Sequence, residues 1–201
     1  MTPFTLVEID QLAAELGPLY GPLVVFAAET ALRPAEWLAV HRSDVDRSQG
    51  VVVVERTLGP EGVKPYAKTD FSRRRVPLSS RALAALDDLP RRLDTRLVFP
   101  AESGGHRDLD NWRRREWKPA LEAAGVAKRR PYDLRHTAIS NWLAAGLSVF
   151  EVSRYAGTSL AMISSVYGHL ALGHEANARA RLDAFARECA EIVPQGADAT
   201  D

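Results

Sequence analysis

The chain has 201 residues, enough for one well-packed domain, and its 26 Lys and Arg residues balance its 26 Asp and Glu residues. Its 46% hydrophobic and 26% charged residues are ordinary for a globular protein, so disorder is not the default. One cysteine, Cys189, excludes a disulfide framework and a cysteine-type zinc site and fits a reducing cytoplasm. The sequence shows no secretion signal and no apolar run near the ~20 residues of a membrane span, so we expect a cytoplasmic protein without a membrane partner.

Helix signals dominate the N-terminal part of the chain. Thr5 and Glu8 have capping-box spacing before an apolar series at helical intervals, and Gly17-Pro18 ends that series. Pro34 biases Arg33 away from helical geometry, so we expect a break there, after which the proline begins a short helix. The expected helices cover about residues 5–16, 20–32 and 34–40.

Valine-rich and turn segments predict a small sheet in the middle of the chain. Residues 51–57, 64–68 and 74–78 are expected strands, and residues 58–62 form a turn. Together they predict one three-stranded antiparallel sheet. The helical pattern then resumes. The later helices are expected at about residues 80–89, 111–124, 133–145, 148–156, 159–167 and 173–190.

The fold class is therefore mostly α with a small three-stranded antiparallel β-sheet. We expect one domain over residues 1–193, followed by a flexible polar tail at 194–201. The helix at about 173–190 is amphipathic, so it could pack on its own domain or dock on a neighbouring copy. The apolar residues of this segment are Ala176, Ala180, Leu182, Phe185, Cys189 and Ile192.

The sequence carries no motif typical of a metal or cofactor site. It has no H-E-x-x-H motif and no glycine-rich phosphate loop before a helix. Its five histidines do not stand at a metal-binding spacing, although His169 and His174 are near each other. We therefore expect neither a metal nor a cofactor.

Basic residues bunch in three places although the formal net charge is zero. A nucleic-acid binder usually shows a basic excess, so the total argues against that role, whereas the clustering allows a basic face. Each cluster could instead be a solvated helix end or loop. The clusters are Arg73, Arg74 and Arg75; Arg113, Arg114 and Arg115; and Lys128, Arg129 and Arg130.

Two arginines stand at expected helix starts. Arg135 lies in the first turn of a helix that Asp133 could cap, where free N–H groups and the helix dipole favour an anion. Arg33 follows an apolar helix, with Glu36 one turn on to orient it. A guanidinium can bind a phosphate through two parallel hydrogen bonds. Each arginine could instead form a structural ion pair with a nearby carboxylate.

Two further residues have a chemical and a structural interpretation. Lys68 ends an expected strand, where it could donate a proton to a leaving oxygen or protect an exposed sheet edge. Tyr167, in the segment Ser-Val-Tyr-Gly-His, could act as a nucleophile or pack in the core with a solvated hydroxyl.

The order of these segments resembles the catalytic domain of the tyrosine recombinases, the phage-integrase family. The resemblance runs from about Thr5 to His174 and joins four boxes in the family's order. The boxes are Leu-Arg-Pro-Ala-Glu-Trp-Leu-Ala-Val followed by Ser-Asp-Val-Asp, Lys-Thr with Arg-Arg-Val-Pro-Leu, Asp-Leu-Arg-His-Thr, and Val-Tyr-Gly-His-Leu.

The resemblance implies a metal-independent division of labour at a phosphate in double-stranded DNA. Arg33 and Arg135 would bind the scissile phosphate and stabilise the charge of its transition state. Lys68 would be the general acid for the 5′-hydroxyl leaving group, and His136 would help to hold or deprotonate the nucleophile. Tyr167 would attack phosphorus and form a 3′-phosphotyrosine.

The sequence departs from the family pattern in three ways. Tyr132 stands where the arginine box usually opens with His or Lys, so it keeps one hydrogen-bond donor near the DNA but no charge. Thr158 stands where members usually have the histidine or tryptophan that supports the phosphate, so we expect weakened catalysis. The N-terminal core-binding domain of the family is expected to be absent from this chain.

The expected function is site-specific DNA recombination by a homotetramer on DNA, with a monomer possible in the free protein. Two rivals remain open. A catalytically weakened integrase remnant would bind DNA without cutting it, whereas a type IB topoisomerase would share the chemistry but need no defined site. The target sequence cannot be read, since base contacts do not follow from one sequence.

Overall fold

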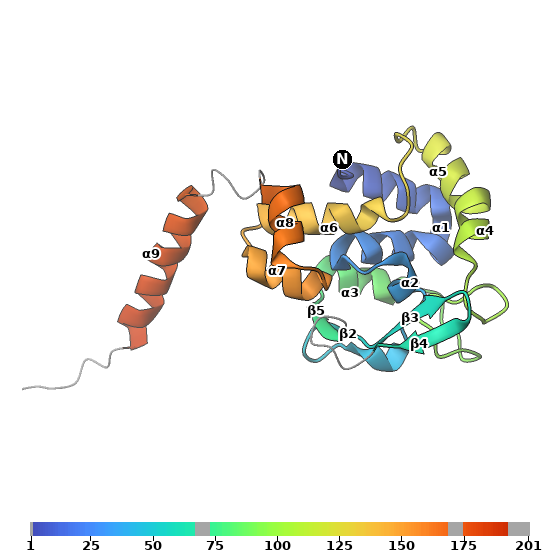
Figure 1. Ribbon diagram of the computed structural model, residues 1–201, viewed down its shortest axis with the longest axis horizontal. Coiled ribbons are helices and arrows are strands. Elements are labelled where there is room, and N and C mark those ends of the chain that lie inside the picture. The colour runs from blue at the N-terminus through green and yellow to red at the C-terminus, as the bar shows by residue number, and fades with distance from the viewer. Residues whose placement is uncertain (1, 67–72, 169–174, 193–201) are drawn as a thin grey trace, which may run out of the picture.

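The structure is a computed structural model that describes residues 2–66, 73–168 and 175–192. Helices form most of the body, and the strands lie together along one side of it (Figure 1). The strands are β1 (Val45–Asp46), β2 (Val51–Val54), β3 (Arg56–Gly59), β4 (Gly62–Pro65) and β5 (Arg74–Pro77). The helices are α1 (Leu6–Thr30), α2 (Pro34–Trp37), the 3₁₀ turn η1 (Arg42–Asp44), α3 (Ser80–Asp87), α4 (Leu109–Trp112), the π-helical turn η2 (Arg113–Trp117), α5 (Lys118–Ala123), α6 (Asp133–Ala144), α7 (Val149–Ala156), α8 (Leu160–Tyr167) and α9 (Glu175–Ile192).

The first two expected helices are one kinked element, α1. Its capping box is present, because the Thr5 N–H donates to Glu8 Oε2 over 2.7 Å and the Glu8 N–H donates to Thr5 Oγ1 over 3.1 Å. Gly17 alone leaves helical geometry, with φ 66° and ψ −174°, which glycine adopts without steric cost. The expected end at Gly17-Pro18 is therefore a kink, after which the helix continues.

The expected break at Arg33 is confirmed. Helix α1 ends at Thr30, and Ala31 adopts a left-handed conformation with φ 52°, unusual for a residue with a Cβ. Arg33 is extended, with φ −67° and ψ 151°, and Pro34 begins α2. The chain therefore changes direction between α1 and α2, at Ala31–Arg33.

A three-stranded antiparallel sheet is present, but its strands differ from those expected. The sheet order is β1-β2-β5, with Val52 opposite both Val45 and Val76. The expected strand at 51–57 is divided between β2 and β3, and β3 pairs with β4 in a separate hairpin. A tight hairpin pairs its two strands with each other, so β4 is not available to the sheet, and the two-residue β1 is too short to show an alternating pattern.

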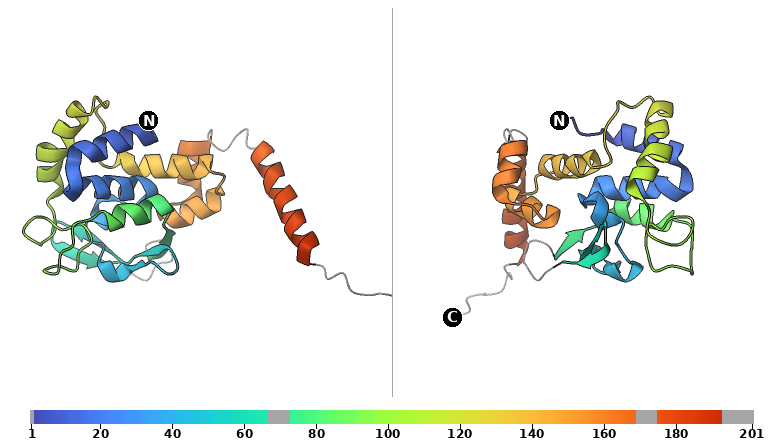
Figure 2. Two further views of the ribbon diagram at one scale, coloured as in Figure 1. Left: turned by 180° about the vertical axis from the view of Figure 1, so that it is seen from behind. Right: turned by 45° about the vertical axis from the view of Figure 1, so that its right-hand side comes forward.

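Two hydrophobic clusters fill the body, and α6 belongs to both. The larger cluster joins α1, α2, the sheet, α3 and the α4–α5 region, and it includes Leu134 at the start of α6. The smaller cluster joins the later part of α6, including Ile139 and Leu143, to α7 and α8, and it includes Tyr167. Helices α7 and α8 accordingly lie together at one end of the body (Figures 1 and 2). The first turn of α6 thus lies where the two clusters meet.

Helix α9 confirms the expected C-terminal helix and stands apart from the body (Figures 1 and 2). Leu182 and Phe185 expose 70% and 66% of their surface, so neither packs on the body. Arg181 of this helix contacts the body, where its Nη1 donates to the Gly146 carbonyl over 2.6 Å. Within the described ranges, no helix has the length and apolar character needed to cross a membrane.

Candidate active site

The first turn of α6 supplies Arg135 and His136. Arg135 is 4% exposed, and its Nη1 donates to the Ala31 carbonyl over 2.6 Å. Burial, followed by repulsion from Arg33, lowers the pKa of the Arg135 guanidinium to about 10. Arg135 therefore remains charged at neutral pH. No carboxylate within hydrogen-bonding distance neutralises it in the described part of the chain, so an anion bound here would stabilise it.

Asp133 does not cap α6 as expected. It is the first residue of the helix, and its Oδ2 accepts from the Arg130 N–H over 2.7 Å, outside the helix. Tyr132 occupies the cap position without a side-chain cap hydrogen bond. The carboxylate therefore closes the turn that leads into α6, which fixes the backbone just before Arg135.

Arg33 is held by a carboxylate and a carbonyl. Its Nη1 donates to Glu36 Oε1 over 2.9 Å, and its Nη2 donates to the Gly157 carbonyl over 2.6 Å. Burial alone would lower the pKa of Arg33, but the Glu36 charge holds the pKa above its ordinary value. The expected pair with Glu36 is thus present. Because 37% of the Arg33 side chain stays exposed, this pairing is compatible with contact to a ligand.

Glu36 is the centre of a buried set of hydrogen bonds, which we call the Glu36 network. Its carboxylate accepts from Arg33, from Nη1 and Nη2 of Arg74 over 2.9 and 2.7 Å, and from the Tyr66 hydroxyl over 2.7 Å. Although burial opposes ionisation, the Arg74 hydrogen bonds and charge and the Arg33 N–H lower the pKa of Glu36 to about 2. The Arg74 Nε also donates to the Tyr155 carbonyl at the end of α7 over 2.7 Å. The network therefore joins α2, β5 and α7 around Arg33.

Tyr167 and His136 face each other across α8 and α6. The Tyr167 hydroxyl contacts Nδ1 of His136, and the two ring centroids are 5.8 Å apart. Burial raises the pKa of Tyr167 to about 12, against an opposing effect of Arg135. Burial also lowers the pKa of His136 below its ordinary 6.5, so the imidazole is neutral at neutral pH and can accept the tyrosine proton. The Tyr132 ring meets the other side of His136 edge-on, with centroids 5.3 Å apart.

The structure brings together most of the residues that the sequence singled out. Arg33, Arg135, His136 and Tyr167 come from three separate parts of the chain and form one group. Thr158 directly follows the Gly157 carbonyl that accepts from Arg33, and no hydrogen bond of its own side chain is found within the described residues. Lys68 lies outside the described residues.

Two residues expected to bind DNA are structural. Arg74 is 7% exposed because the Glu36 network surrounds it. Arg129 binds the Glu8 carboxylate over 2.7 Å, and its guanidinium lies 4.3 Å from the centre of the Phe4 ring. Neither guanidinium is therefore presented to DNA.

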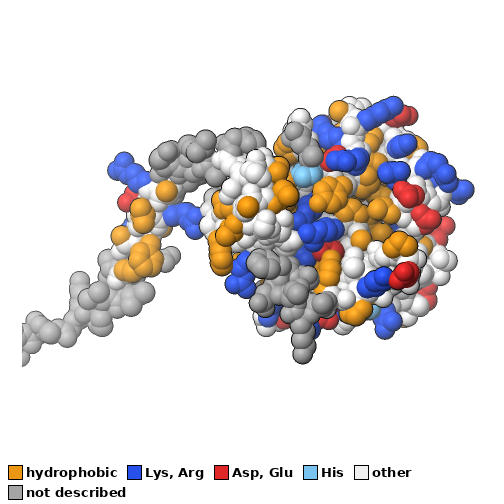
Figure 3. Space-filling model, viewed as in Figure 1, with side chains coloured by type: hydrophobic (Ala, Val, Ile, Leu, Met, Phe, Trp, Pro, Cys, Tyr) orange, Lys and Arg blue, Asp and Glu red, His pale blue; other side chains and the backbone are white. Residues whose placement is uncertain are grey.

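The other members of these clusters remain exposed. In the 73–75 and 128–130 clusters, the exposed basic residues are Arg73, Arg75, Lys128 and Arg130. Each contacts a polar partner at an exposed position of its own, where solvent weakens the interaction. The partners are Glu55, Gln49, Glu122 and Asp133 respectively. Lysine and arginine side chains are intermixed with acidic ones over the face in Figure 3, consistent with the zero net charge.

Three partners of the site were not identified from the sequence. The Ala31 carbonyl, the Gly157 carbonyl and the Tyr66 hydroxyl bind Arg135, Arg33 and Glu36 across 104, 124 and 30 positions of the chain. Local spacing does not reveal contacts of this length. The left-handed Ala31 and Gly157 follow helix ends, so a helix-end signal alone could have marked these two positions.

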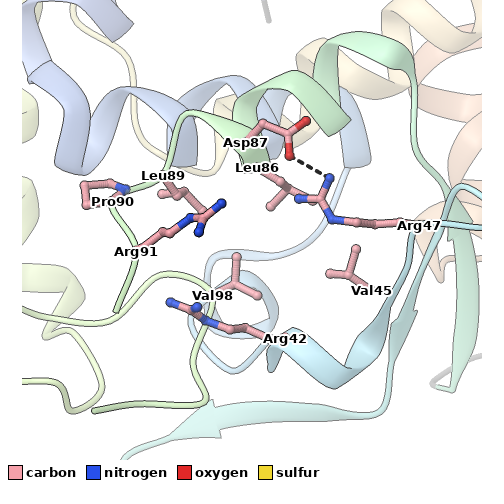
Figure 4. Close-up of a pocket in the computed structure, with 9 residues that line it drawn as sticks. All are labelled: Arg42, Val45, Arg47, Leu86, Asp87, Leu89, Pro90, Arg91 and Val98. Atoms are coloured by element: carbon pink, nitrogen blue, oxygen red, sulfur yellow. Dashed lines mark ion pairs between the residues drawn. The ribbon is translucent and has the colours of Figure 1, made fainter. Parts of the chain in front are cut away.

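A separate hollow lies between β1 and the end of α3 (Figure 4). It has a volume of about 590 Å³, and Arg42, Arg47 and Arg91 extend around an apolar floor that includes Leu86 and Val98. Arg47 pairs with Asp87 over 2.7 Å. This hollow shares no residue with the Arg33–Tyr167 group, so it is a distinct feature.

Comparison with known proteins gives a consistent assignment. The model of the Phage integrase family matches residues 11–174. A Mycobacterium tuberculosis protein named as a prophage phiRv2 integrase is 28% identical over 192 residues, covering 92% of this chain and 51% of that protein. A shufflon-specific DNA recombinase of Escherichia coli is 30% identical over 145 residues, covering 72% of this chain and 33% of that protein. The chain thus spans about half or less of the length of these relatives.

Solved structures show the same fold. The Tn1549 transposon integrase in complex with circular intermediate DNA superposes with a TM-score of 0.71 at 17% identity, covering 90% of this chain and 67% of that one. The XerA recombinase gives a TM-score of 0.66 at 22% identity, covering 82% and 59%. With four sequence boxes in order, their arginines, histidine and tyrosine in one group, and a family match over most of its length, the chain belongs to the phage integrase family of tyrosine recombinases.

Proposed function

We propose that this chain is a site-specific DNA recombinase that cleaves and rejoins DNA strands through a 3′-phosphotyrosine. The observation that carries the proposal is the contact between the Tyr167 hydroxyl and Nδ1 of a neutral His136, next to two guanidiniums. A nucleophile, a base and two phosphate-binding cations are the parts that phosphoryl transfer to a tyrosine requires.

The proposed chemistry assigns a role to each of these residues and to Lys68, which lies outside the described residues. The Tyr167 oxygen attacks phosphorus and its proton passes to His136, while the bond from phosphorus to the 5′ oxygen breaks. Lys68 donates a proton to that 5′ oxygen, and the 3′ end stays attached to Tyr167. The reverse steps rejoin a strand, and no external energy source is needed because one phosphoester replaces another. Arg33 and Arg135 stabilise the negative charge that builds on the phosphoryl oxygens.

Thr158 and Tyr132 determine which neutral hydrogen-bond donors this site offers to DNA. Thr158 supplies one neutral hydroxyl beside the Gly157 carbonyl, where the family usually has an aromatic or imidazole donor. Tyr132 is 38% exposed at the edge of the His136 ring, where its hydroxyl can donate to a DNA phosphate. These two replacements favour a second candidate function, a weakened integrase that binds DNA with little cleavage.

The proposed partner is double-stranded DNA in a homotetramer. The exposed Arg73, Arg75, Lys128 and Arg130 would contact phosphates, which position the protein without reading sequence. Helix α9 presents Leu182 and Phe185 to solvent, so we assign it to docking on a neighbouring copy. A cytoplasmic location on the nucleoid suits this role.

A covalent adduct on nicked DNA tests the proposal. The protein is incubated with a duplex nicked next to the cleavage position, so that the released fragment diffuses away and the phosphotyrosine accumulates. The parent should form an adduct and Tyr167→Phe should form none, while both bind the duplex equally. DNA binding without an adduct from the parent would support the weakened integrase. Relaxation of supercoiled DNA of any sequence would support a type IB topoisomerase instead.

A further inference from the structure

The N-terminal segment 3–8 packs against the loop that leads into α6. The Phe4 side chain is buried, and the Arg129 guanidinium lies 4.3 Å from the centre of its ring. Nη1 of Arg129 donates to the Pro3 carbonyl over 3.2 Å. The same guanidinium binds the two carboxylate oxygens of Glu8 over 3.0 and 2.7 Å. Arg129 therefore fastens the 3–8 segment to the chain just before α6.

Thr137 makes a second connection to this segment from inside α6. Its side chain is fully buried, and its Oγ1 accepts from the Phe4 N–H over 2.9 Å, although the two residues are 133 positions apart. The same hydroxyl donates to the Asp133 carbonyl, one turn earlier in α6, over 3.0 Å. One hydroxyl thus joins the 3–8 segment to both ends of the first turn of α6.

The turn between these two ends carries Arg135 and His136. Both side chains reach partners on other elements. Arg135 donates to the Ala31 carbonyl after α1, and His136 contacts the Tyr167 hydroxyl at the end of α8. The place of the first turn of α6 therefore sets where the guanidinium and the imidazole stand relative to Tyr167. Displacement of a reacting group by about 1 Å can cost about 10²-fold in rate, so a contact that fixes this turn has a consequence for cleavage.

We propose that the 3–8 segment positions Arg135 and His136 for cleavage, and that it acts through the Thr137 hydroxyl and through Arg129. The inference rests on the proposed function, because it needs a phosphate on Arg135 and the transfer of the nucleophile's proton to His136. Thr137 is fully buried, so it cannot touch the DNA itself. Thr137 and Arg129 are positioning residues.

The test removes the Thr137 hydroxyl and keeps the shape of the side chain. Thr137→Val leaves the Phe4 N–H without its acceptor in a buried place, so the 3–8 segment should shift and release the first turn of α6. The rate of adduct formation is measured in single-turnover reactions at saturating nicked duplex, and the dissociation constant of the same duplex is measured separately. Thr137→Val should slow the saturating rate roughly 10-fold and change the dissociation constant less than about threefold.

Two further variants separate the connection from a general change at a buried threonine. Thr137→Ser keeps the hydroxyl, so it should restore the saturating rate to within about threefold of the parent. Thr30→Val is the matched control. Thr30 is also fully buried and donates to the carbonyl one turn earlier, that of Phe26, over 2.8 Å, but its hydroxyl accepts from no other segment among the described residues. Thr30→Val should change the rate less than about twofold.

Arg129→Met cuts the other connection of the 3–8 segment. It removes the contacts with Pro3 and Glu8 and keeps an unbranched apolar side chain against Phe4. The saturating rate should fall about threefold, with an unchanged dissociation constant. Thermal unfolding of every variant sets a temperature at which all of them are folded. If Thr137→Val does not fold, the rate of Arg129→Met decides alone.

The outcomes separate this inference from the proposed function. No adduct from the parent would overturn the proposed function, and the inference with it. A parent that cleaves while a folded Thr137→Val or Arg129→Met keeps the parent rate would overturn the inference alone. Equal slowing of Thr137→Val and Thr30→Val, or a Thr137→Ser that stays slow, would also overturn it. A weaker dissociation constant with an unchanged saturating rate would do the same, because the segment would then act on DNA binding.

Discussion

Two buried arginines of this protein, Arg74 and Arg135, lie in contrasting surroundings. Arg74 forms a two-pronged pair with Glu36 and donates its Nε to a backbone carbonyl, so its charge is matched within the chain. Arg135 has one backbone carbonyl as its hydrogen-bond partner in the described residues, and its pKa falls to about 10 because of burial and the repulsion of Arg33. The contacts of Arg74 therefore hold its side chain in place when no ligand is bound. The second leaves a positive charge that a phosphate would neutralise.

Replacement of each arginine by methionine should separate the two roles, and it carries the largest expected effects. Arg74→Met leaves Glu36 with fewer partners in a buried site, so it should lower the free energy of unfolding by about 3–5 kcal/mol. Arg135→Met should lower that free energy by less than about 2 kcal/mol, yet slow adduct formation about 10²–10³-fold. Denaturant unfolding and the nicked-duplex assay measure the two quantities. Equal losses of stability would remove the distinction between the two arginines.

Gly157 tests how closely Arg74 is packed. A Cβ on Gly157 would lie 2.9 Å from Arg74 Cζ, and the residue has φ +63°. Gly125 is the matched control, because it has φ +65° with nothing within 4 Å of the added Cβ. Gly125→Ala should cost about 1 kcal/mol from the backbone alone, whereas Gly157→Ala should cost about 2–4 kcal/mol. Similar melting temperatures for the two variants would show that Arg74 can move aside.

The pH dependence of cleavage tests His136, which follows Arg135 in α6 and is the proposed base. The pKa of His136 lies below its ordinary 6.5, so the imidazole accepts the Tyr167 proton at neutral pH and becomes protonated only under more acidic conditions. The single-turnover rate should therefore be flat near neutrality and fall as pH drops through a value below 6.5. His136→Gln should be slower and should lack this fall. A rate that rises steadily through neutral pH would mean that His136 is not the base.

The smallest expected effects compare two neighbouring arginines of the 128–130 cluster. Arg130 has 66% of its side chain exposed, whereas Arg129 has 14% exposed and binds Glu8. Arg130→Ala should weaken DNA binding at every sequence and reduce the salt dependence by about one counterion, with little change in stability. Arg129→Ala should leave DNA binding and its salt dependence nearly unchanged. It should instead lower the free energy of unfolding by about 1 kcal/mol. Binding titrations at several salt concentrations distinguish the two.

Local signals predicted the helices and the break at Arg33 because prolines, caps and glycines act within a few residues. The same signals could not separate Arg74 from Arg73 and Arg75, since alternate residues of a strand face opposite sides and the sequence did not show which side is buried. The strand pairing was partly wrong for a related reason. Strand pairing depends on which segments meet in the fold. Strand β1 has two residues and is too short to show an alternating pattern in the sequence.

The residues grouped around Tyr167 were identified from the resemblance to a known family. The backbone carbonyls that hold the two arginines of this group were seen only in the structure. Four ordered boxes pointed to Arg33, Arg135, His136 and Tyr167, and these four residues lie in one group in the structure. The Ala31 and Gly157 carbonyls that hold the two arginines are backbone groups, so no side-chain motif identifies them, and a helix-end signal marks only their positions. Lys68 remains a prediction.

The division of the core into two clusters bears on how such a protein can change through evolution. Tyr167 packs with Ile163 in the smaller cluster, whereas the Arg33 segment follows Leu32 of the larger one. A substitution at Ile163 would therefore shift Tyr167, the proposed nucleophile, relative to Arg33 while most of the body kept its packing. Reaction rate and overall foldedness can accordingly drift independently in this architecture, and selection on one need not disturb the other.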